Sequence, residues 1–217
     1  MAEDHSKLIF NDGRFVGNFD KYYSVCSDPW QQSRLSLYRR SDRLKLLELV
    51  TTFTEHSLVD IGCGLGFQAE LLAEYASDYV GFDKSEVCIK KARRNFPNLD
   101  FRIGSFPLLD ELKVLKPDTV VLSEIFWYVL DDLDEFVHFL RENMPAVTVI
   151  WLISMWPKAP KGSRVGVDEY GTNQAIVEKL GLNILYIGEH PVPGPFEDYI
   201  LVLAGNYLDK RFRNAGI

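Results

Sequence analysis

Three glycines in one short turn form the segment of this sequence best suited to binding a ligand. Residues 59–66, with the sequence VDIGCGLG, read as the end of a strand, the turn itself and the start of a helix. Glycine tolerates positive φ and has no side chain, so a ligand can approach its backbone closely. Open α/β sheets bind their ligands at turns of this kind, just beyond the carboxyl ends of the strands. Glycine triplets also occur in ordinary tight turns, so the neighbouring segments must decide between the two interpretations.

The spacing of these glycines argues against a dinucleotide site. The fingerprint G-x-G-x-x-G would require a glycine at position 67. The chain has Phe67 there, and the third glycine comes one residue earlier, at Gly66. The pattern D-x-G-C-G-x-G instead resembles motif I of the class I, Rossmann-like methyltransferases that depend on S-adenosylmethionine (SAM). This resemblance implies SAM as the cofactor and S-adenosylhomocysteine (SAH) as the product. The small Cys63 within the turn is interpreted as a packing residue rather than a nucleophile.

A second apolar strand, DYVGFD at residues 78–83, ends in an acid. Asp83 lies about twenty residues beyond the glycines, where nucleoside-binding folds place the acid that accepts hydrogen bonds from ribose hydroxyls. In the alternative, Asp83 only caps a helix that begins at Lys84. We favour the ribose role, because the acid is in register with the glycine turn.

The segment after the predicted fourth strand has the sequence SEIFWYV, residues 123–129. In the methyltransferase fold, an acid at this point lies where the cofactor and the methyl acceptor meet. Glu124 could therefore hold the acceptor, take its proton or contact the methionine end of the cofactor. A carboxylate in this apolar setting is costly to keep without a partner. Trp127 and Tyr128 are candidates for the acceptor pocket, with packing in the core as the alternative for both.

The N-terminal region carries a narrower resemblance. D-P-W at residues 28–30, followed by Y-R-R at 38–40, is similar to the D-P-W … Y-E-R-[RK] pattern of NodS-like methyltransferases, which N-methylate an amino sugar of a chitooligosaccharide. The SEIFWYV segment also resembles S-E-V-L-Y-Y-L of that group. The resemblance implies that Trp30 and Tyr38 belong to a helical lid that closes over the cofactor. A hydrophobic staple at the start of a helix is the alternative for Trp30. Arg39 replaces the glutamate of the pattern, so the substrate of that group is not carried over.

Methyl transfer makes few demands on side chains. The methyl group moves from the sulfonium of the cofactor to a nucleophile by in-line displacement, so most of the rate should come from holding the two reactants aligned. A general base helps only if the nucleophile arrives protonated. The resemblance implies a cofactor site comprising Trp30, Tyr38, Asp60, Gly62, Cys63, Gly64, Gly66, Asp83, Lys84, Ser105, Phe106, Ser123 and Glu124. Ser105 and Phe106 would flank the adenine, and an ordinary polar turn is the alternative for Ser105. The candidates for catalysis are Glu124 and His190, and those for the acceptor pocket are Trp127, Tyr128 and Tyr170.

Alternating strands and helical segments must position these residues. The predicted strands are Leu58–Ile61, Tyr79–Phe82, Asp100–Ile103, Thr119–Leu122 and Val147–Ile153, with helical segments between them at 67–76, 85–95, 108–115 and 132–143. Short apolar strands between helices indicate βαβ units and a parallel sheet covered on both faces. After a helix at Asn173–Leu180, strands at Leu182–Gly188 and Tyr199–Ala204 flank a proline-rich connection that is too short for a helical crossover. This last pair is therefore predicted to be antiparallel.

Residues 31–52 are predicted to form one long amphipathic helix upstream of the sheet. Its leucines, Leu44 among them, would form the apolar face, and its arginines, including Arg40 and Arg43, the solvent face. The predicted fold class is α/β, a seven-stranded, mostly parallel sheet with an antiparallel C-terminal strand, helices on both faces and an N-terminal helical lid. Residues 1–52 would form the lid, 53–208 the SAM-binding domain and 209–217 a basic tail, within one structural domain overall.

The composition of the 217-residue chain argues against several other classes. Its net charge of −7 disfavours a general binder of nucleic acids or membrane surfaces. The three cysteines and four histidines show no ligand spacing, so no metal is expected. The N-terminus lacks the features of a signal peptide and no apolar run approaches a membrane span, so a cytoplasmic location is expected.

These observations predict a SAM-dependent methyltransferase acting on an amine or hydroxyl of a polar small molecule, such as a sugar or a natural-product intermediate. The amine is favoured by the family resemblance alone, and the protein would be a monomer or a homodimer. Two other classes stay open, a non-catalytic SAM-binding module that regulates a partner and a NAD-dependent oxidoreductase. An RNA methyltransferase is disfavoured by the acidic charge and by the lack of an N-P-P-Y-type motif after the fourth strand.

Overall fold

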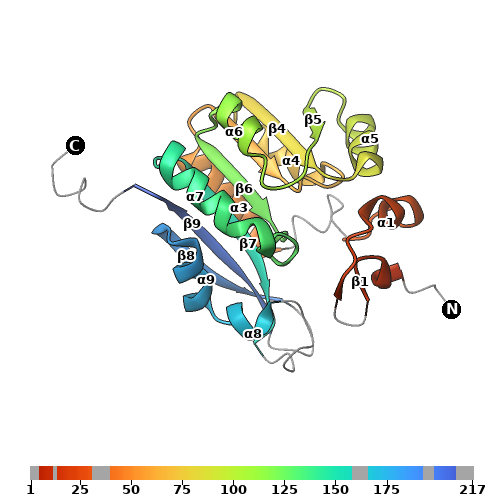
Figure 1. Cartoon of the computed structure of the whole chain (residues 1–217). Coiled ribbons are helices and arrows are strands. Elements are labelled where there is room, and N and C mark those ends of the chain that lie inside the picture. Colours follow the sequence, from red (N-terminus) through yellow and green to blue (C-terminus); the bar gives the residue numbers. More distant parts are fainter. Residues whose placement is uncertain (1–4, 12–13, 31–39, 158–165, 193–197, 209–217) are drawn as a thin grey trace.

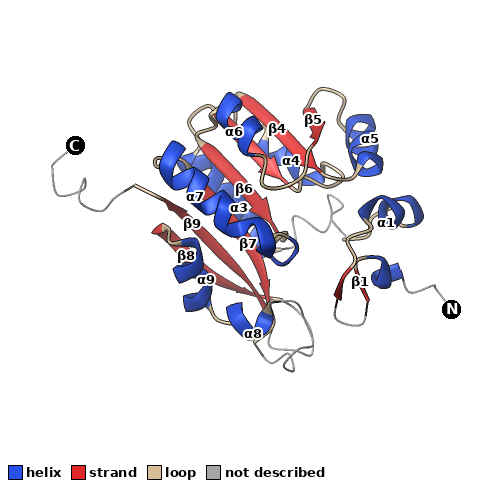
Figure 2. Ribbon diagram, viewed as in Figure 1, coloured by secondary structure: helices blue, strands red, loops and turns tan. Residues whose placement is uncertain are grey.

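A seven-stranded sheet organises the chain, for which a computed structural model describes residues 5–11, 14–30, 40–157, 166–192 and 198–208. The strand order is β5-β4-β3-β6-β7-β9-β8 (Figures 1 and 2). The strands are β3 (Ser57–Ile61), β4 (Asp78–Asp83), β5 (Asp100–Ile103), β6 (Thr119–Ser123), β7 (Thr148–Met155), β8 (Asn183–Pro191) and β9 (Tyr199–Asn206). Strands β3 to β7 pair in parallel, and β9 pairs antiparallel with both β7 and β8. The predicted fold class is confirmed.

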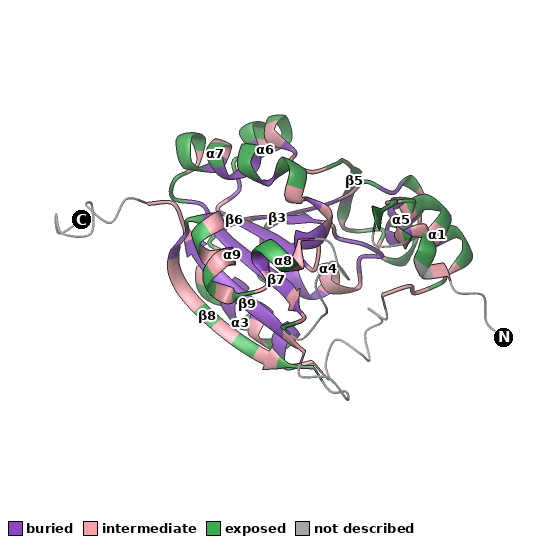
Figure 3. Cartoon of the chain, turned by 60° about the horizontal axis from the view of Figure 1, so that its bottom comes forward, coloured by how far each residue is buried: buried purple, intermediate pink, exposed green. Residues whose placement is uncertain are grey.

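Helices cover both faces of this sheet (Figure 1). The helices are α3 (Ser41–Phe53), α4 (Phe67–Leu72), α5 (Glu86–Asn95), α6 (Leu109–Leu115), α7 (Leu133–Asn143), α8 (Val167–Tyr170) and α9 (Asn173–Leu180), with 3-10 turns η2 (Phe126–Tyr128) and η3 (Leu130–Asp132). Alternate strand residues point to opposite faces. On β6, Val120 and Leu122 pack in a core with α6, α7 and α9, whereas Val121 packs with α3, α4 and α5. Figure 3 shows the strands mostly buried, while the edge strand β8 alternates between half-buried and exposed residues.

The strand order reverses between β3 and β6, at the centre of the sheet. From β3 the chain crosses to β4 on one side, and later returns to β6 on the other side. Such a reversal is a topological switch point, where loops from adjacent strands diverge and ligands bind. The glycine turn follows β3 and Glu124 follows β6, so the two segments that the sequence singled out meet there. None of the described helices has the length and apolar character needed to cross a membrane.

The helix upstream of the sheet differs from the prediction. Residues 31–39 lie outside the described residues, and α3 begins at Ser41. Arg43 is buried, with 4% of its surface exposed, whereas Leu44 is 50% exposed, so the predicted assignment of these two residues was wrong. The inward face of α3 follows the helical spacing of Arg43, Leu46 and Val50. Arg43 can take an inward position because Ser123 and Glu124, at the carboxyl end of β6, accept its hydrogen bonds.

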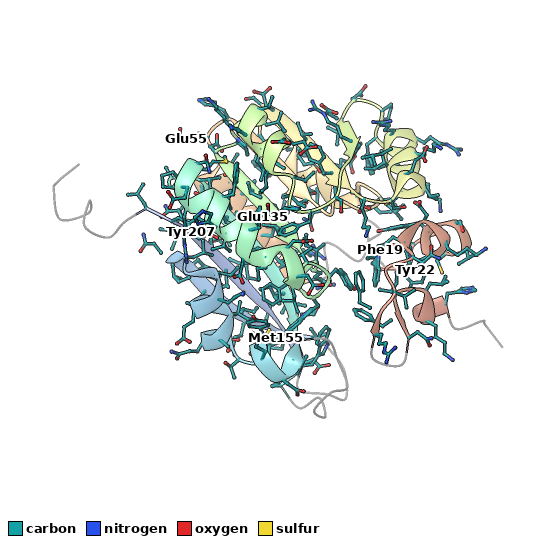
Figure 4. All side chains as sticks on the ribbon, viewed as in Figure 1. Phe19, Tyr22, Glu55, Glu135, Met155 and Tyr207 are labelled. Carbon is teal, nitrogen blue, oxygen red and sulfur yellow. The ribbon has the colours of Figure 1, made fainter. Side chains whose placement is uncertain are left out.

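A small N-terminal unit packs beside this domain. It comprises residues 5–11 and 14–30, with η1 (His5–Leu8), the strands β1 (Phe10–Asn11) and β2 (Arg14–Phe15), and α1 (Phe19–Val25). Helix α1 lies next to α5, and Figure 4 shows Phe19 and Tyr22 on it. Asp20 accepts hydrogen bonds at the start of α5 from Ser85 Oγ at 2.6 Å and from the Val87 amide at 3.2 Å. The unit is therefore tied to the helix that follows Asp83.

The central strands predict where the domain is most sensitive to mutation. Trp151 on β7 is fully buried and contacts the rings of Phe126 and Phe136. We expect Trp151→Ala to lower the free energy of unfolding by about 3–5 kcal/mol, because it leaves a large cavity. Val114→Ala is a suitable control, since Val114 is 81% exposed, and it should change stability by less than about 0.5 kcal/mol. Urea denaturation measures both, and similar midpoints for the two variants would contradict this description of the core.

Candidate active site

The glycine turn has the backbone conformation that the sequence predicted. Gly62, Gly64 and Gly66 have φ of 81°, 58° and 82°, in the left-handed region that favours glycine. The amides of Gly62 and Cys63 both donate to the Phe82 carbonyl, at 2.7 and 2.9 Å, which holds the turn against β4. A Cβ at Gly62 would lie 2.5 Å from Ile125 Cγ2, so the turn also abuts the loop after β6.

Asp83 lies at the end of β4, beside this turn. Its Oδ2 accepts from the Gly64 amide at 3.2 Å and its Oδ1 from the Ser85 amide at 2.9 Å. The cap of α5 is Ser85, whose hydroxyl accepts from the Cys88 amide, so the capping alternative for Asp83 does not hold. Each oxygen of a carboxylate can accept more than one hydrogen bond, which leaves Asp83 capacity for vicinal hydroxyls. Burial raises the pKa of Asp83 to about 6.

Asp60, within β3, is a second acid of this site and is buried, whereas Asp83 is partly exposed. Its Oδ2 accepts from the Tyr79 hydroxyl at 3.0 Å, and its Oδ1 has no hydrogen-bond partner among the described residues. Burial raises the pKa of Asp60 to about 7. Burial also raises the pKa of the Cys63 thiol, so Cys63 is neutral and packs in the core, as the sequence predicted.

Glu124 has two arginine partners. Its Oε1 accepts from Nη2 of Arg40 at 2.7 Å and from Nη2 of Arg43 at 2.8 Å. Its Oε2 lies 3.5 Å from the donating hydroxyl of Ser154. The sequence predicted that this carboxylate would need a partner, and the partners come from α3 and the residue that precedes it.

Arg43 joins two further side chains to this ion pair. Its Nη1 donates to the hydroxyl of Ser123 and to the side-chain oxygen of Gln68. Neither Arg43 nor Gln68 was identified from the sequence. One signal was present, because Arg43 shares the helical face of Leu46 and Val50, and an arginine on an inward face requires buried partners.

Aromatic rings connect the N-terminal unit to the loop after β6. Tyr128 contacts four of them, with centroids 5.6–6.2 Å away, namely Phe10, Phe15, Phe19 and Trp30. Trp30 Nε1 also donates to the hydroxyl of Tyr23 at 3.1 Å, and Tyr23 packs against Leu65 of the glycine turn. The N-terminal unit therefore contacts both the glycine turn and the loop after β6. Tyr38, the other predicted lid residue, lies outside the described residues.

Two of the predicted pocket residues lie in the core. Trp127 is 5% exposed, and its Nε1 donates to the Ser154 carbonyl at 2.8 Å. Tyr170 on α8 is also buried, and its ring contacts Phe126 edge-on at 6.0 Å. The core-packing alternative describes Trp127, whereas Tyr128 is half-buried and contacts the N-terminal unit.

The other predicted residues are spread more widely. Ser105 is exposed, and Phe106 packs on Phe136 of α7 with ring centroids 4.7 Å apart. Lys84 is exposed, with its Nζ 5.5 Å from the centroid of the Phe19 ring. His190 lies on the edge strand β8, three strands from β6, or about 14 Å at the usual strand spacing. Its Nδ1 lies 3.3 Å from the hydroxyl of Ser41, the first residue of α3 and the neighbour of Arg40. The described residues include no group of three His, Cys, Asp or Glu side chains placed to hold a metal ion.

Comparisons with known proteins find methyltransferases that are similar to this chain. Residues 54–148 match the family model described as "Methyltransferase domain". A probable S-adenosylmethionine-dependent methyltransferase from Mycolicibacterium smegmatis is 31% identical over 85 residues, which are 39% of this chain and 31% of that protein. Trans-aconitate 2-methyltransferase from Acidovorax ebreus is 27% identical over 116 residues, 52% of this chain and 44% of that protein. The chain thus spans less than half the length of these curated relatives.

Solved structures show the same fold. The N-methyltransferase NodS from Bradyrhizobium japonicum WM9, in complex with SAH, is similar with a TM-score of 0.60 at 15% identity, covering 86% of this chain and 98% of that chain. Residues 54–148 thus match a methyltransferase domain, and the chain has the Rossmann-like fold of a solved methyltransferase in complex with SAH. Both findings agree with the class of protein and the cofactor, SAM, that the motif resemblance implied.

The ion pairs of Glu124 predict unequal effects on stability. Glu124→Gln removes the nearer of two carboxylates that pair with the buried Arg43, the other being Asp42 at 3.7 Å, and we expect the free energy of unfolding to fall by about 1–3 kcal/mol, less than for a fully buried pair because Glu124 is 27% exposed. Arg40→Gln should cost less, since Arg40 is 33% exposed and its second partner, the buried Asp42, keeps its ion pair with Arg43. Chemical denaturation of both variants tests this, and an equal or larger loss for Arg40→Gln would contradict the buried role of Arg43.

Proposed function

We propose that this chain transfers the methyl group of SAM to an amine or hydroxyl of a polar small molecule and releases SAH. The observation that carries the proposal is the contact between Asp83 and the glycine turn, with the carboxylate 3.2 Å from the Gly64 amide. This contact joins an acceptor for ribose hydroxyls to a stretch of bare backbone. Both lie at the switch point of the sheet, where this fold binds ligands.

The residues of the carboxyl edge fit SAM in chemistry as well as in position. Gly62, Gly64 and Gly66 let the methionine part approach the backbone, and Asp83 accepts from the ribose. When bound, SAM supplies a methyl group activated by a positively charged sulfur. The acids at this edge favour a cationic ligand, because the carboxylates of Asp60 and Asp83 form no ion pair among the described residues.

The remaining predicted contacts extend this cofactor site. Ser105 and Phe106 would lie at the adenine. Lys84 follows β4, Ser123 ends β6 and Cys63 lies in the glycine turn, and each would contact the cofactor from there. Trp30 belongs to the N-terminal unit, which contacts both the glycine turn and the loop after β6. A unit in that position would exclude water from the reacting groups.

Glu124 is the residue we propose at the acceptor. It directly follows β6, and its neighbour Ile125 touches the glycine turn, so a bound acceptor there would lie close to the methyl donor. Its Oε1 is occupied by two arginines, which leaves Oε2 to orient an amine or hydroxyl or to accept its proton. Tyr128 would border the same space. An amine acceptor is supported by the resemblance of the D-P-W and SEIFWYV segments to NodS-like enzymes, and His190 takes no part in this proposal.

Ligand binding tests the proposed function directly. We expect calorimetric titration to show binding of SAM and SAH but not of NAD. Asp83→Ala should weaken SAH binding at least tenfold, about the contribution of one hydrogen bond to a charged group. Asp78→Ala is the matched control, since Asp78 is exposed at the opposite end of the same strand. Binding of NAD in place of SAH, or equal effects of the two variants, would refute the assignment of this site.

The pH dependence of SAH binding provides a second test. Since burial raises the pKa of Asp83 to about 6, the carboxyl gains a proton as pH falls through 6, and SAH affinity should fall with it. A raised carboxyl pKa means that the folded state binds more protons than the unfolded state between pH 4 and 6, so at this group acidification stabilises the fold. Protonation of Asp83 therefore lowers the affinity without destabilising the fold through this group.

Variants assign this titration to Asp83 or to Asp60. Asp83→Asn should abolish the change of affinity near pH 6. Asp60→Asn should preserve it, because the pKa of Asp60 is raised to about 7 and its titration lies higher. A profile that is flat from pH 5 to 8 in the unmodified protein would show that Asp83 does not hold the ligand.

A further inference from the structure

Arg43 occupies the junction between the two parts of the site that must be aligned. Its guanidinium donates hydrogen bonds to three side chains, those of Gln68, Ser123 and Glu124, and its Nε lies 3.7 Å from Oδ2 of Asp42. Gln68 belongs to α4, the helix that the glycine turn opens, with Gly66 as its N-cap. Ser123 ends β6 and Glu124 follows it. One buried guanidinium therefore connects the helix next to the cofactor with the carboxylate next to the acceptor.

Glu124 needs such support, because its backbone is unusual. Its φ of 60° lies in the left-handed region, which is uncommon for a residue with a side chain. The conformation is fixed at the backbone by the Glu124 amide, which donates to the Leu152 carbonyl at 2.7 Å. The side chain is fixed by Arg40 and Arg43. Residues in sparsely populated conformations persist where the surroundings determine them, often at functional sites.

We propose that Arg43 is a positioning residue for methyl transfer, which sets the Glu124 carboxylate against the methyl-bearing end of the cofactor by tying it to the helix of the glycine turn. This inference rests on the proposed function. An arginine suits the task because its planar fork presents several donors in fixed directions, whereas a lysine is a point charge on a flexible stem. Methyl transfer depends on the alignment of donor and acceptor, so a small displacement of Glu124 would slow the reaction even while the cofactor stays bound.

Sinefungin provides a probe that does not require the acceptor to be known. This SAM analogue carries an amine where SAM carries its methyl group, and SAH has no group at that position. A carboxylate that faces the position can form a charge-assisted hydrogen bond with the amine. For the unmodified protein we expect sinefungin to bind about tenfold more tightly than SAH in calorimetric titrations. The ratio of the two affinities reports the placement of Glu124, because all other contacts of the two ligands are shared.

Arg43→Lys should bring this ratio close to one, as should Glu124→Gln. Gln68→Ala changes no charge and removes one of the three hydrogen-bond partners of Arg43. It should lower the ratio in the same direction, so the test does not depend on the folding of Arg43→Lys. Arg93→Lys is the matched control. Arg93 also presents a fork, with Nε and Nη2 donating to the Phe101 carbonyl at 2.9 and 2.6 Å, away from Glu124. This control should keep the ratio of the unmodified protein.

The outcomes separate the inference from the function on which it rests. An unchanged ratio in Arg43→Lys, even with weaker binding of both ligands, would overturn the positioning role. Arg43 would then either stabilise the fold through its ion pair or contact a part that the two ligands share. Equal affinities of the unmodified protein for sinefungin and SAH would also overturn it, because Glu124 would not face the methyl position. Failure of both ligands to bind would refute the proposed function itself.

Discussion

The two hydrogen bonds from the Gly62 and Cys63 amides to the Phe82 carbonyl are the constraint on which the rest of the site depends. They hold the glycine turn against the end of β4 and so bring the Gly64 amide to Asp83. Because β3 also pairs with β6, the same turn touches Ile125 on its other side. A single turn is thereby fixed against both neighbouring strands, and a ligand lying over it is within reach of side chains from each.

Charged side chains at this edge of the sheet are stabilised in two different ways. Arg43 and Glu124 compensate each other in an ion pair with further hydrogen bonds, the condition under which a buried guanidinium is tolerated. Asp60 accepts a hydrogen bond from a tyrosine hydroxyl, and Asp83 accepts hydrogen bonds from two backbone amides. Burial raises the pKa of Asp60 to about 7 and that of Asp83 to about 6. A positively charged cofactor would favour their ionised forms. The edge is thus suited to a cationic ligand before any such ligand binds.

The N-terminal unit contributes to the site through packing rather than through charge. Tyr128 is the ring at which the unit meets the loop after β6, and Tyr23 is the ring at which it meets Leu65 of the glycine turn. The tie between Asp20 and Ser85 adds a polar contact beside Asp83. These contacts span the region in which we propose that the cofactor lies, so the unit has the position expected of a cover for that region.

Local features of the sequence determined the strands, the glycine turn and the place of Asp83. Buried strands appear as short apolar runs, and the turn and its acid are recognised by spacing along the chain. Only the tertiary structure decided that Arg43 turns inward to Glu124, that Trp127 packs in the core and that His190 lies on an outer strand. Arg43 and Glu124 are 81 positions apart. Whether such residues meet depends on the order of the strands and on which face of a helix is covered. Only the second property has a local signal, the helical spacing of Arg43 with Leu46 and Val50, and the order of the strands has none.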